Sequence, residues 1–239
     1  MNSRLHAHLG GAGIRRAIGL ALFMVLAIAG GAAAQTAVDL QLVLAVDASG
    51  SVDQVRFELQ KRGYVAAFRH ARVLQAIRSG PNRAIGVTMV QWTGPMLQVQ
   101  VVGWTLIGDE QTAFAFSDAI ERAPRQLFGG GTSISGAIDY ATTLFPNSPI
   151  RANRRVIDVS GDGSNNRGRP VTLARDEAVA SGIGINGLPT LALEPDLDHY
   201  YYDSVIGGPG AFVVAAQNYE TFADAILKKL IIEIAANDR

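Results

Sequence analysis

The stretch that decides the fold is Leu40-Gln41-Leu42-Val43-Leu44-Ala45-Val46, followed directly by Asp47-Ala48-Ser49-Gly50-Ser51. The apolar run is typical of a strand buried on both faces, as in a parallel sheet covered by helices. After it, one carboxylate and two hydroxyls follow at intervals of two residues, on Asp47, Ser49 and Ser51. These are hard oxygen ligands, which suit Mg²⁺, Mn²⁺ or Ca²⁺ and not Zn²⁺ or Cu²⁺.

Beyond this stretch, helical and strand periodicities alternate along the chain. A capping box at Ser51–Gln54 predicts a helix that runs to about Gly80. The short link 93–96 between two β-rich runs predicts an antiparallel hairpin. We therefore expect an α/β fold with a doubly wound, mostly parallel sheet, one antiparallel edge strand and helices on both faces. Further strands are expected at 38–46, 84–92, 97–104, 155–160, 183–191 and 211–216, and helices at 109–122, 133–145, 171–181 and after a cap at Asn218.

The first 34 residues have the order of a secretory signal peptide. Basic residues without acids come first, then the apolar run 17–29, then the small residues Ala32-Ala33-Ala34. The apolar run is short for a membrane span, although an uncleaved N-terminal anchor is the alternative. Arg15-Arg16 leaves twin-arginine export open beside the general route. Cleavage after Ala34 would place residues 35–239 in the periplasm or the medium, with no membrane span.

The composition of residues 35–239 predicts one domain and excludes several classes of protein. Without residues 1–34, which hold three Arg and no acid, 18 basic and 21 acidic residues remain, a net charge of −3. This balance does not indicate a nucleic-acid surface. The chain has no Cys, so no disulfide can hold it together and the apolar core must do so.

Two later segments extend the pattern seen at Asp47. Gly130-Gly131-Thr132-Ser133 is a glycine-rich turn before a helix, and Ser160-Gly161-Asp162-Gly163 follows a predicted strand. Ligands of open α/β sheets bind beyond the carboxyl ends of the strands. Two carboxylates and three hydroxyls at that edge would leave room for water or a ligand around Mg²⁺. Ser51 and Thr132 could instead serve only as helix caps.

In these segments the chain resembles the von Willebrand factor A (VWA) domain family. The metal-ion-dependent adhesion site of that family is Asp-x-Ser-x-Ser, then a distant Thr and a distant Asp. The resemblance covers nearly all of residues 35–239 and is closest to a bacterial secreted subfamily of undetermined role. It implies a doubly wound fold that holds Mg²⁺, or Mn²⁺ or Ca²⁺, and a protein partner that offers an acidic residue. The matching positions are Asp47, Ser49, Ser51, Thr132 and Asp162.

The sequence departs from the family at Gly161, where a threonine usually precedes the last carboxylate. Asp158, inside the same strand, is interpreted as a paired structural carboxylate or as a residue that orients the site. Tyr200-Tyr201-Tyr202 could be a partner surface or the core of a short helix. Arg167 and Arg169 are interpreted as solvated loop residues rather than a substrate clamp.

Three functions stay open at this point. The first is a secreted, non-enzymatic module that captures an acidic group of a partner through its metal. The second is a Mg²⁺-dependent hydrolase of phosphate esters, for which no second metal, base or nucleophile is evident. The third is a scaffold that keeps the fold without a metal. The few His and absent Cys favour holding a ligand over zinc catalysis.

Overall fold

The computed structural model describes residues 36–236; the expected signal segment, residues 1–34, lies outside them. The central sheet has the strand order β4-β3-β2-β6-β7, and β2 pairs parallel with both of its neighbours. Only β4, at one edge, runs antiparallel, which confirms the expected fold class and its hairpin. The strands are β2 (Leu40–Asp47), β3 (Ile85–Trp92), β4 (Gln98–Ile107), β6 (Arg154–Gly161) and β7 (Gly184–Pro189).

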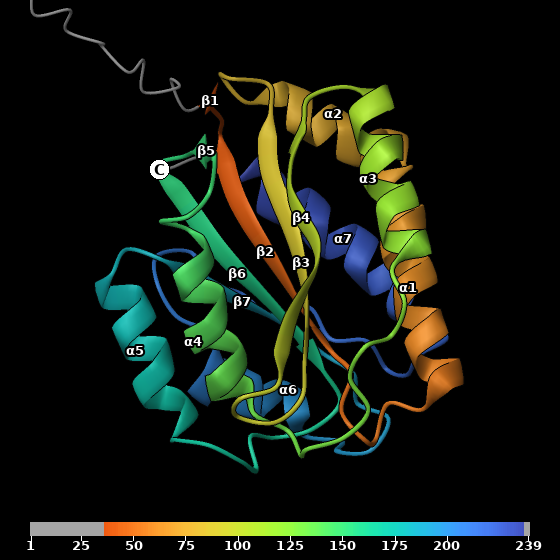
Figure 1. Ribbon diagram of the computed structural model, residues 1–239, viewed down its shortest axis with the longest axis vertical. Helices are drawn as coiled ribbons and strands as arrows, with labels where there is room; N and C mark the ends of the chain where they lie inside the picture. Colours follow the sequence, from red (N-terminus) through yellow and green to blue (C-terminus); the bar gives the residue numbers. More distant parts are fainter. Residues whose placement is uncertain (1–35, 237–239) are drawn as a thin grey trace, which may run out of the picture. The chain divides into compact units, whose positions relative to one another are not determined.

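The strand order reverses at β2, and this reversal places the site. The chain passes from β2 to β3 on one side and returns later to β6 on the other side. Connections that leave neighbouring strands in opposite directions open a crevice beyond their carboxyl ends. The carboxyl ends of β2 and β6 lie toward the lower end of Figure 1. Asp47 ends β2 and Asp162 follows β6, so both residues lie at these strand ends.

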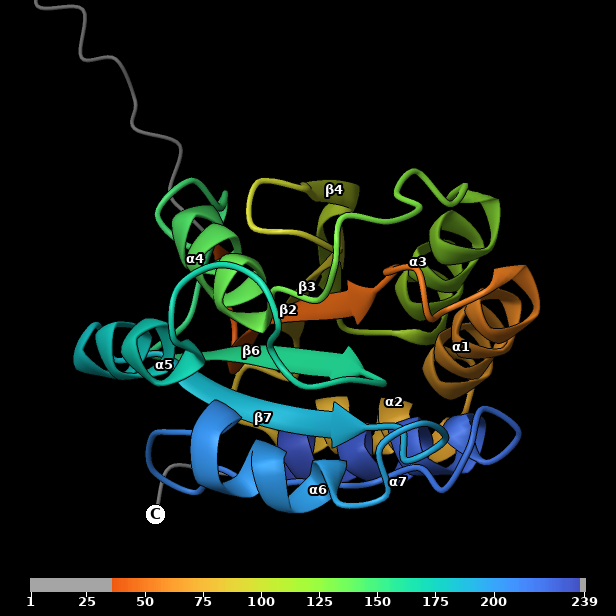
Figure 2. The same cartoon turned by 90° about the horizontal axis from the view of Figure 1, so that it is seen from below.

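Helices cover both faces of the sheet (Figures 1 and 2), and β2 alternates between the two cores. Leu42 and Leu44 belong to one core, and Val43 and Ala45 to the other. None of the helices in the described part is long and apolar enough to cross a bilayer. The core with Leu42 and Leu44 is covered by α1 (Gln54–Phe68), α2 (Ala71–Ser79), α3 (Glu110–Arg122) and α7 (Phe222–Ala235). The core with Val43 and Ala45 is covered by α4 (Ile134–Leu144) and α5 (Val171–Ala180). The short helix α6 (Leu197–Tyr200) and the π-helix η1 (Tyr201–Val205) lie beside β7.

The first expected helix differs from the structure at its start and in its middle. The side chain of Asp53, not Ser51, caps α1 by accepting a hydrogen bond from the Arg56 N–H at 2.8 Å. The Ser51 hydroxyl is instead committed to Asp162. His70 then caps a second helix, because its Nδ1 accepts from the Arg72 N–H at 3.1 Å. The break lets α2 turn and pack against α7.

Two other expectations near the C-terminus also needed correction. The expected strand 211–216 forms only isolated bridges, Val213 with Gly187 and Ala216 with Thr190. Asn218 closes the turn before α7 by accepting from the Thr221 N–H at 3.0 Å, and the helix begins only at Phe222. The sequence also did not indicate the two-residue strands β1 (Thr36–Ala37) and β5 (Ile150–Arg151), which pair in parallel.

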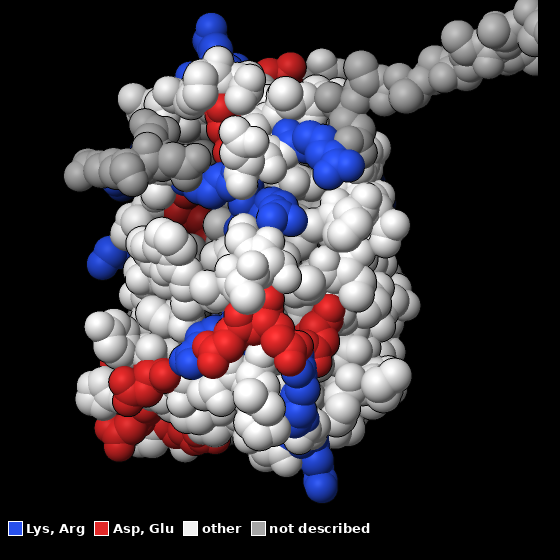
Figure 3. Space-filling view, turned by 90° about the vertical axis from the view of Figure 1, so that its left-hand side faces the viewer, with Lys and Arg blue, Asp and Glu red and all other residues white. Residues whose placement is uncertain are grey.

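Acidic and basic side chains are mixed on the side of the molecule that carries α5. Figure 3 shows a band of acidic side chains across the lower half of this face, with basic side chains directly beside it. The ion pairs here are Arg169 with Asp139 and Glu177, and Arg175 with Asp176. This face therefore lacks the continuous basic surface that binds nucleic acid.

A fully buried ion network lies between β6 and α7. The Lys229 ammonium is 2.7 Å from Asp158 Oδ1 and 3.2 Å from Glu233 Oε2, and all three side chains are at most 1% exposed. Glu233 Oε1 also accepts a hydrogen bond from Asn186 at 2.7 Å. Burial raises the pKa of Asp158, and the Lys229 charge opposes that rise. Asp158 is thus a paired structural carboxylate rather than part of the site.

Replacing Lys229 by Met is expected to destabilise the protein strongly. The change leaves two carboxylates buried without a counter-charge, and breaking such a pair costs about 3–5 kcal/mol. Lys228→Met is the matched control, because Lys228 is the exposed neighbour on the same helix. Urea unfolding of both variants measures the difference, and equal stabilities would show that the network contributes nothing.

Candidate functional site

A cavity of about 290 Å³ opens at the carboxyl end of the sheet. Its walls come from four segments: the loop after β2, the glycine-rich turn before α4, the loop after β6 and the loop after β7. Four of the five predicted site residues line it, and Asp47 lies directly behind them. The lining residues are Ser49, Gly50, Ser51, Gly129, Gly130, Gly131, Thr132, Asp162, Gly163, Asn166, Leu193 and Glu194.

A chain of hydrogen bonds joins the first segment to the third. Asp47 Oδ1 accepts from the Ser49 N–H at 2.7 Å, which turns the backbone back over the strand end. The Ser49 and Ser51 hydroxyls lie 3.1 Å apart, and the Ser51 hydroxyl donates to Asp162 Oδ1 at 2.6 Å. Ser51 and Asp162, which are 111 positions apart in sequence, thus belong to one row of hydrogen-bonded oxygen atoms.

The second oxygen of Asp47 is the unusual atom of the site. Asp47 is fully buried, and its Oδ2 receives no hydrogen bond from the described residues. Burial, and then the negative charge of Asp162, raise the pKa of Asp47 from 3.8 to about 7. A buried carboxylate that lacks a donor is costly, so this atom is suited to a cationic partner.

Thr132 is placed by the glycine-rich turn and by Asn166. Gly129, Gly130 and Gly131 all have positive φ, a conformation that few other residues adopt. The Thr132 N–H donates to Asn166 Oδ1 at 2.9 Å, and the Asn166 N–H donates to Thr132 O at 2.9 Å. Within the described residues the Thr132 hydroxyl makes no hydrogen bond, and Thr132 lines the cavity. The helix that follows is capped by Ser133, so Thr132 is not the cap.

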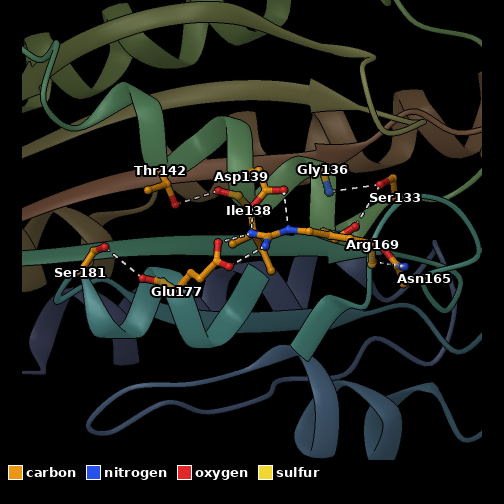
Figure 4. Close-up of polar contacts among 10 residues, drawn as sticks. Ser133, Gly136, Ile138, Asp139, Thr142, Asn165, Arg169, Glu177 and Ser181 are labelled. Carbon is orange, nitrogen blue, oxygen red and sulfur yellow. Dashed lines mark hydrogen bonds and ion pairs between the residues drawn. The ribbon is translucent and has the colours of Figure 1, made fainter. Parts of the chain in front are cut away.

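Figure 4 shows how the loop after β6 is held against α4 and α5. Asn165 Oδ1 accepts from the Ser135 N–H at 3.0 Å. The Arg169 guanidinium lies between Asp139 on α4, at 2.6 and 3.0 Å, and Glu177 on α5, at 2.6 and 2.8 Å. Two parallel hydrogen bonds between a guanidinium and a carboxylate fix the relative orientation of the two groups and also pair their charges. The interpretation of Arg169 as a solvated loop residue is therefore wrong. Its side chain holds the loop after β6 to α4 and α5.

Several residues of the site were not predicted from the sequence. The Tyr219 hydroxyl donates to Asp162 Oδ2 at 2.8 Å, and the Arg56 guanidinium lies 3.9 Å from the same oxygen. Arg125 donates to the backbone carbonyls of Ala48 and Ser49 at 3.0 and 3.1 Å. Each comes from a segment distant from its partner, so no local spacing could have indicated it.

The structure explains why glycine occupies position 161. A Cβ there would lie 2.9 Å from the Tyr201 hydroxyl, 3.0 Å from Asp47 Oδ2 and 3.2 Å from the Trp92 ring. The threonine of the family pattern would not fit, because Tyr201 occupies its space. Within Tyr200-Tyr201-Tyr202, Tyr201 is therefore a core residue and fully buried, whereas the side chain of Tyr202 is 68% exposed.

The donor set fits a hard divalent cation. It consists of two carboxylates and three hydroxyls, and one carboxylate oxygen lacks a donor. In the described part of the chain, no three His, Cys, Asp or Glu side chains cluster as a metal site of the more usual kind. Asp47, Ser49, Ser51, Thr132 and Asp162 are the residues that could hold such an ion.

Comparison with protein families and curated proteins assigns no function. Residues 37–238 match the model of a family described as a protein of unknown function, DUF1194. No curated protein matches the sequence.

Solved structures identify the fold. Proximal thread matrix protein 1 (PTMP1) from the mussel byssus is similar over 83% of this chain and 47% of that one, with 14% identity and a TM-score of 0.58. Another form of it, described as having a zinc-occupied MIDAS motif, gives 13% identity, a TM-score of 0.57, and coverage of 83% and 46%. A von Willebrand factor type A protein from Catenulispora acidiphila gives 16% identity, a TM-score of 0.55, and coverage of 82% and 43%. The fold is therefore that of VWA domains, and the chain spans less than half the length of these proteins.

The metal-free protein is expected to lose stability as the pH rises. The pKa of Asp47 is about 7 when folded and about 4 when unfolded, so the folded state binds this proton more tightly. The stabilisation is complete below about pH 4 and is lost as the pH rises through about 7, a change on the order of a few kcal/mol.

Urea unfolding in chelator at several pH values measures this dependence. Asp47→Asn keeps the shape of the side chain and removes its titration, so the difference between the two proteins isolates the contribution of Asp47. Parallel pH profiles for the two proteins would contradict the prediction.

Proposed function

The chain belongs to the DUF1194 family of proteins of unknown function, and we propose from its site that it is a binding module, not an enzyme. In this proposal Asp47, Ser49, Ser51, Thr132 and Asp162 hold Mg²⁺, with Mn²⁺ or Ca²⁺ as alternatives. The ion then binds an acidic side chain of a protein partner.

The observation that carries the proposal is the buried Asp47 Oδ2, which has no donor among the described residues. It lies behind a cavity into which Ser49, Ser51, Thr132 and Asp162 all face. A bound cation would supply positive charge to these oxygens and leave a position for an anionic ligand. Asp47 Oδ1 also accepts a hydrogen bond from the Ser49 N–H. The same carboxylate therefore fixes the conformation of the loop and contributes negative charge to the site.

Binding rather than catalysis is favoured by the residues that surround the cavity. Those of its lining residues that the structure describes include no His, which is the commonest general base. Tyr219 and Ser51 both donate to Asp162, which holds that carboxylate in one orientation. A similar fold occurs in the pilus adhesin SpaC from Lactobacillus rhamnosus GG, at 14% identity, a TM-score of 0.55, and coverage of 83% of this chain and 31% of that one. Adhesion is a function of that protein, and it agrees with a binding role here.

Calorimetric titration with Mg²⁺, Mn²⁺, Ca²⁺ and Zn²⁺ tests the metal site. The wild-type protein is expected to bind at least one ion, and saturation at about a hundred times Kd would stabilise it by about 2.7 kcal/mol. Asp47→Asn and Thr132→Ala should each weaken binding at least about tenfold, because each removes a ligand (~1.4 kcal/mol). Zn²⁺ is included because a similar structure is described with zinc.

Asp176→Asn is the control, since Asp176 is exposed on α5 and Arg175 is its one ion-pair partner in the described part of the chain. It should bind the ion like the wild-type protein. No heat with any of the four ions, or unchanged binding by Asp47→Asn, would refute the proposed site.

We further propose that residues 1–34 are a signal peptide and that residues 35–239 act in the periplasm or the medium. The support is the basic stretch, apolar run and small residues of that segment. N-terminal sequencing of the exported protein should begin at Gln35. A mature protein that retains Met1 would instead indicate an uncleaved anchor.

A further inference from the structure

Arg167 adjoins two residues that line the cavity, Thr132 and Gly131. Its backbone N–H donates to Thr132 O at 3.1 Å, which fixes its position relative to that residue. Its side chain lies over Gly131, where a Cβ would collide with Arg167 Cγ and lie 3.3 Å from its Nε. Gly131 lines the cavity, so the Arg167 side chain lies next to the cavity wall as far as its Nε.

Arg167 differs from the other arginines around the site. Arg169 pairs with Asp139 and Glu177, Arg125 donates to the Asp47–Ser51 loop, and Arg56 donates to Ser51 O at 2.7 Å. The Arg167 side chain is exposed and makes no hydrogen bond or ion pair with the residues that the structure describes. A guanidinium with free donors is the group best suited to grip a carboxylate with two hydrogen bonds.

The same end of the molecule carries an apolar rim. Leu193 lines the cavity and is 49% exposed, and Phe128, 69% exposed, directly precedes the glycine-rich turn. Leu97 packs on that turn, because a Cβ at Gly130 would lie 2.5 Å from its Cδ1. Exposed apolar groups that cluster, rather than occur singly, mark binding surfaces. Five of the ten large apolar side chains that are exposed in the described part lie on segments at this end: Val55, Met96, Leu97, Phe128 and Leu193.

The rim is fastened to the candidate metal loop. The Phe128 ring centroid lies 4.8 Å from the Arg125 guanidinium, which also donates to the Ala48 and Ser49 carbonyls. Through Arg125, Phe128 of the apolar rim is therefore connected to the loop that carries Ser49.

We propose that the segment bound here is an extended peptide in which an acidic residue is flanked by large apolar residues. Its carboxylate is shared between the cation and Arg167, and its apolar side chains lie on Leu193 and Phe128. The inference rests on the proposed function and adds the identity of the recognised segment. A cavity of about 290 Å³ is at the small end for a ligand pocket, so it suits one inserted side chain with its flanks outside.

Three peptides test the inference: acetyl-Gly-Phe-Glu-Leu-Gly-amide, its Ser-Glu-Ser analogue and its Phe-Gln-Leu analogue. Each is titrated into the Mg²⁺-saturated protein and followed by NMR. The Phe-Glu-Leu peptide is expected to bind at least about tenfold more tightly than either analogue (~1.4 kcal/mol). Chelator should abolish its binding.

Two variants separate the acidic contact from the apolar one. Arg167→Gln should weaken both Glu peptides by a similar factor, at least about tenfold, as for the loss of one hydrogen bond between charged groups. Leu193→Ser should weaken only the Phe-Glu-Leu peptide. Matched controls are Arg72→Gln, an exposed arginine on α2, and Leu106→Ser, a leucine that is 40% exposed at the other end of β4. Both controls should bind like the wild-type protein.

The outcomes distinguish this inference from the proposed function. Equal binding of the Phe-Glu-Leu and Ser-Glu-Ser peptides, or no effect of Arg167→Gln, overturns the inference and leaves a calorimetrically measured Mg²⁺ site intact. If the wild-type protein binds no divalent ion, the proposed function fails and the inference fails with it. If Arg167→Gln changed Mg²⁺ affinity as much as peptide affinity, Arg167 would support the metal loop rather than the ligand, which also overturns the inference.

Discussion

The parallel pairing of β2 with β6 is the interaction on which the rest of the site depends. Its register places Val46 opposite Ser160, so Asp47 ends its strand beside Gly161. That neighbour has no side chain, and this is why Asp47 can lie against the chain that carries Asp162. The two strands are brought together because the sheet reverses its winding at β2, where open α/β sheets form their ligand crevice.

Placing two carboxylates at this crevice is unfavourable unless donors or cations compensate them. The chain compensates Asp162 with the Ser51 and Tyr219 hydroxyls, and it compensates Asp47 Oδ1 with a backbone N–H. Of the four oxygens of Asp47 and Asp162, only Asp47 Oδ2 receives no hydrogen bond from the described residues, so the uncompensated negative charge is concentrated on this atom. This concentration of unmatched negative charge is what makes the cavity suited to a cation.

Polar groups continue along β6, away from the site. Asp158 and Ser160 occupy alternate positions that face α1 and α7, and there they meet Lys229 and the Tyr64 hydroxyl, the latter at 3.2 Å from Ser160. Each group has a partner within the core, so this strand is polar without being part of the cavity. Asp158 and Ser160 face the same side because the pleat of a strand turns every second side chain to the same face.

The sequence by itself determined the alternation of elements, the antiparallel edge and the three segments that meet at the cavity, because apolar periodicity and turn residues are local properties. It could not determine that Tyr219 reaches Asp162 or that Arg169 holds α4 and α5 together. Nor could it separate Arg167, which has no hydrogen bond or ion pair with the described residues, from Arg169, two positions away. These contacts join residues that are distant along the chain, so only the tertiary structure decides which side chains meet.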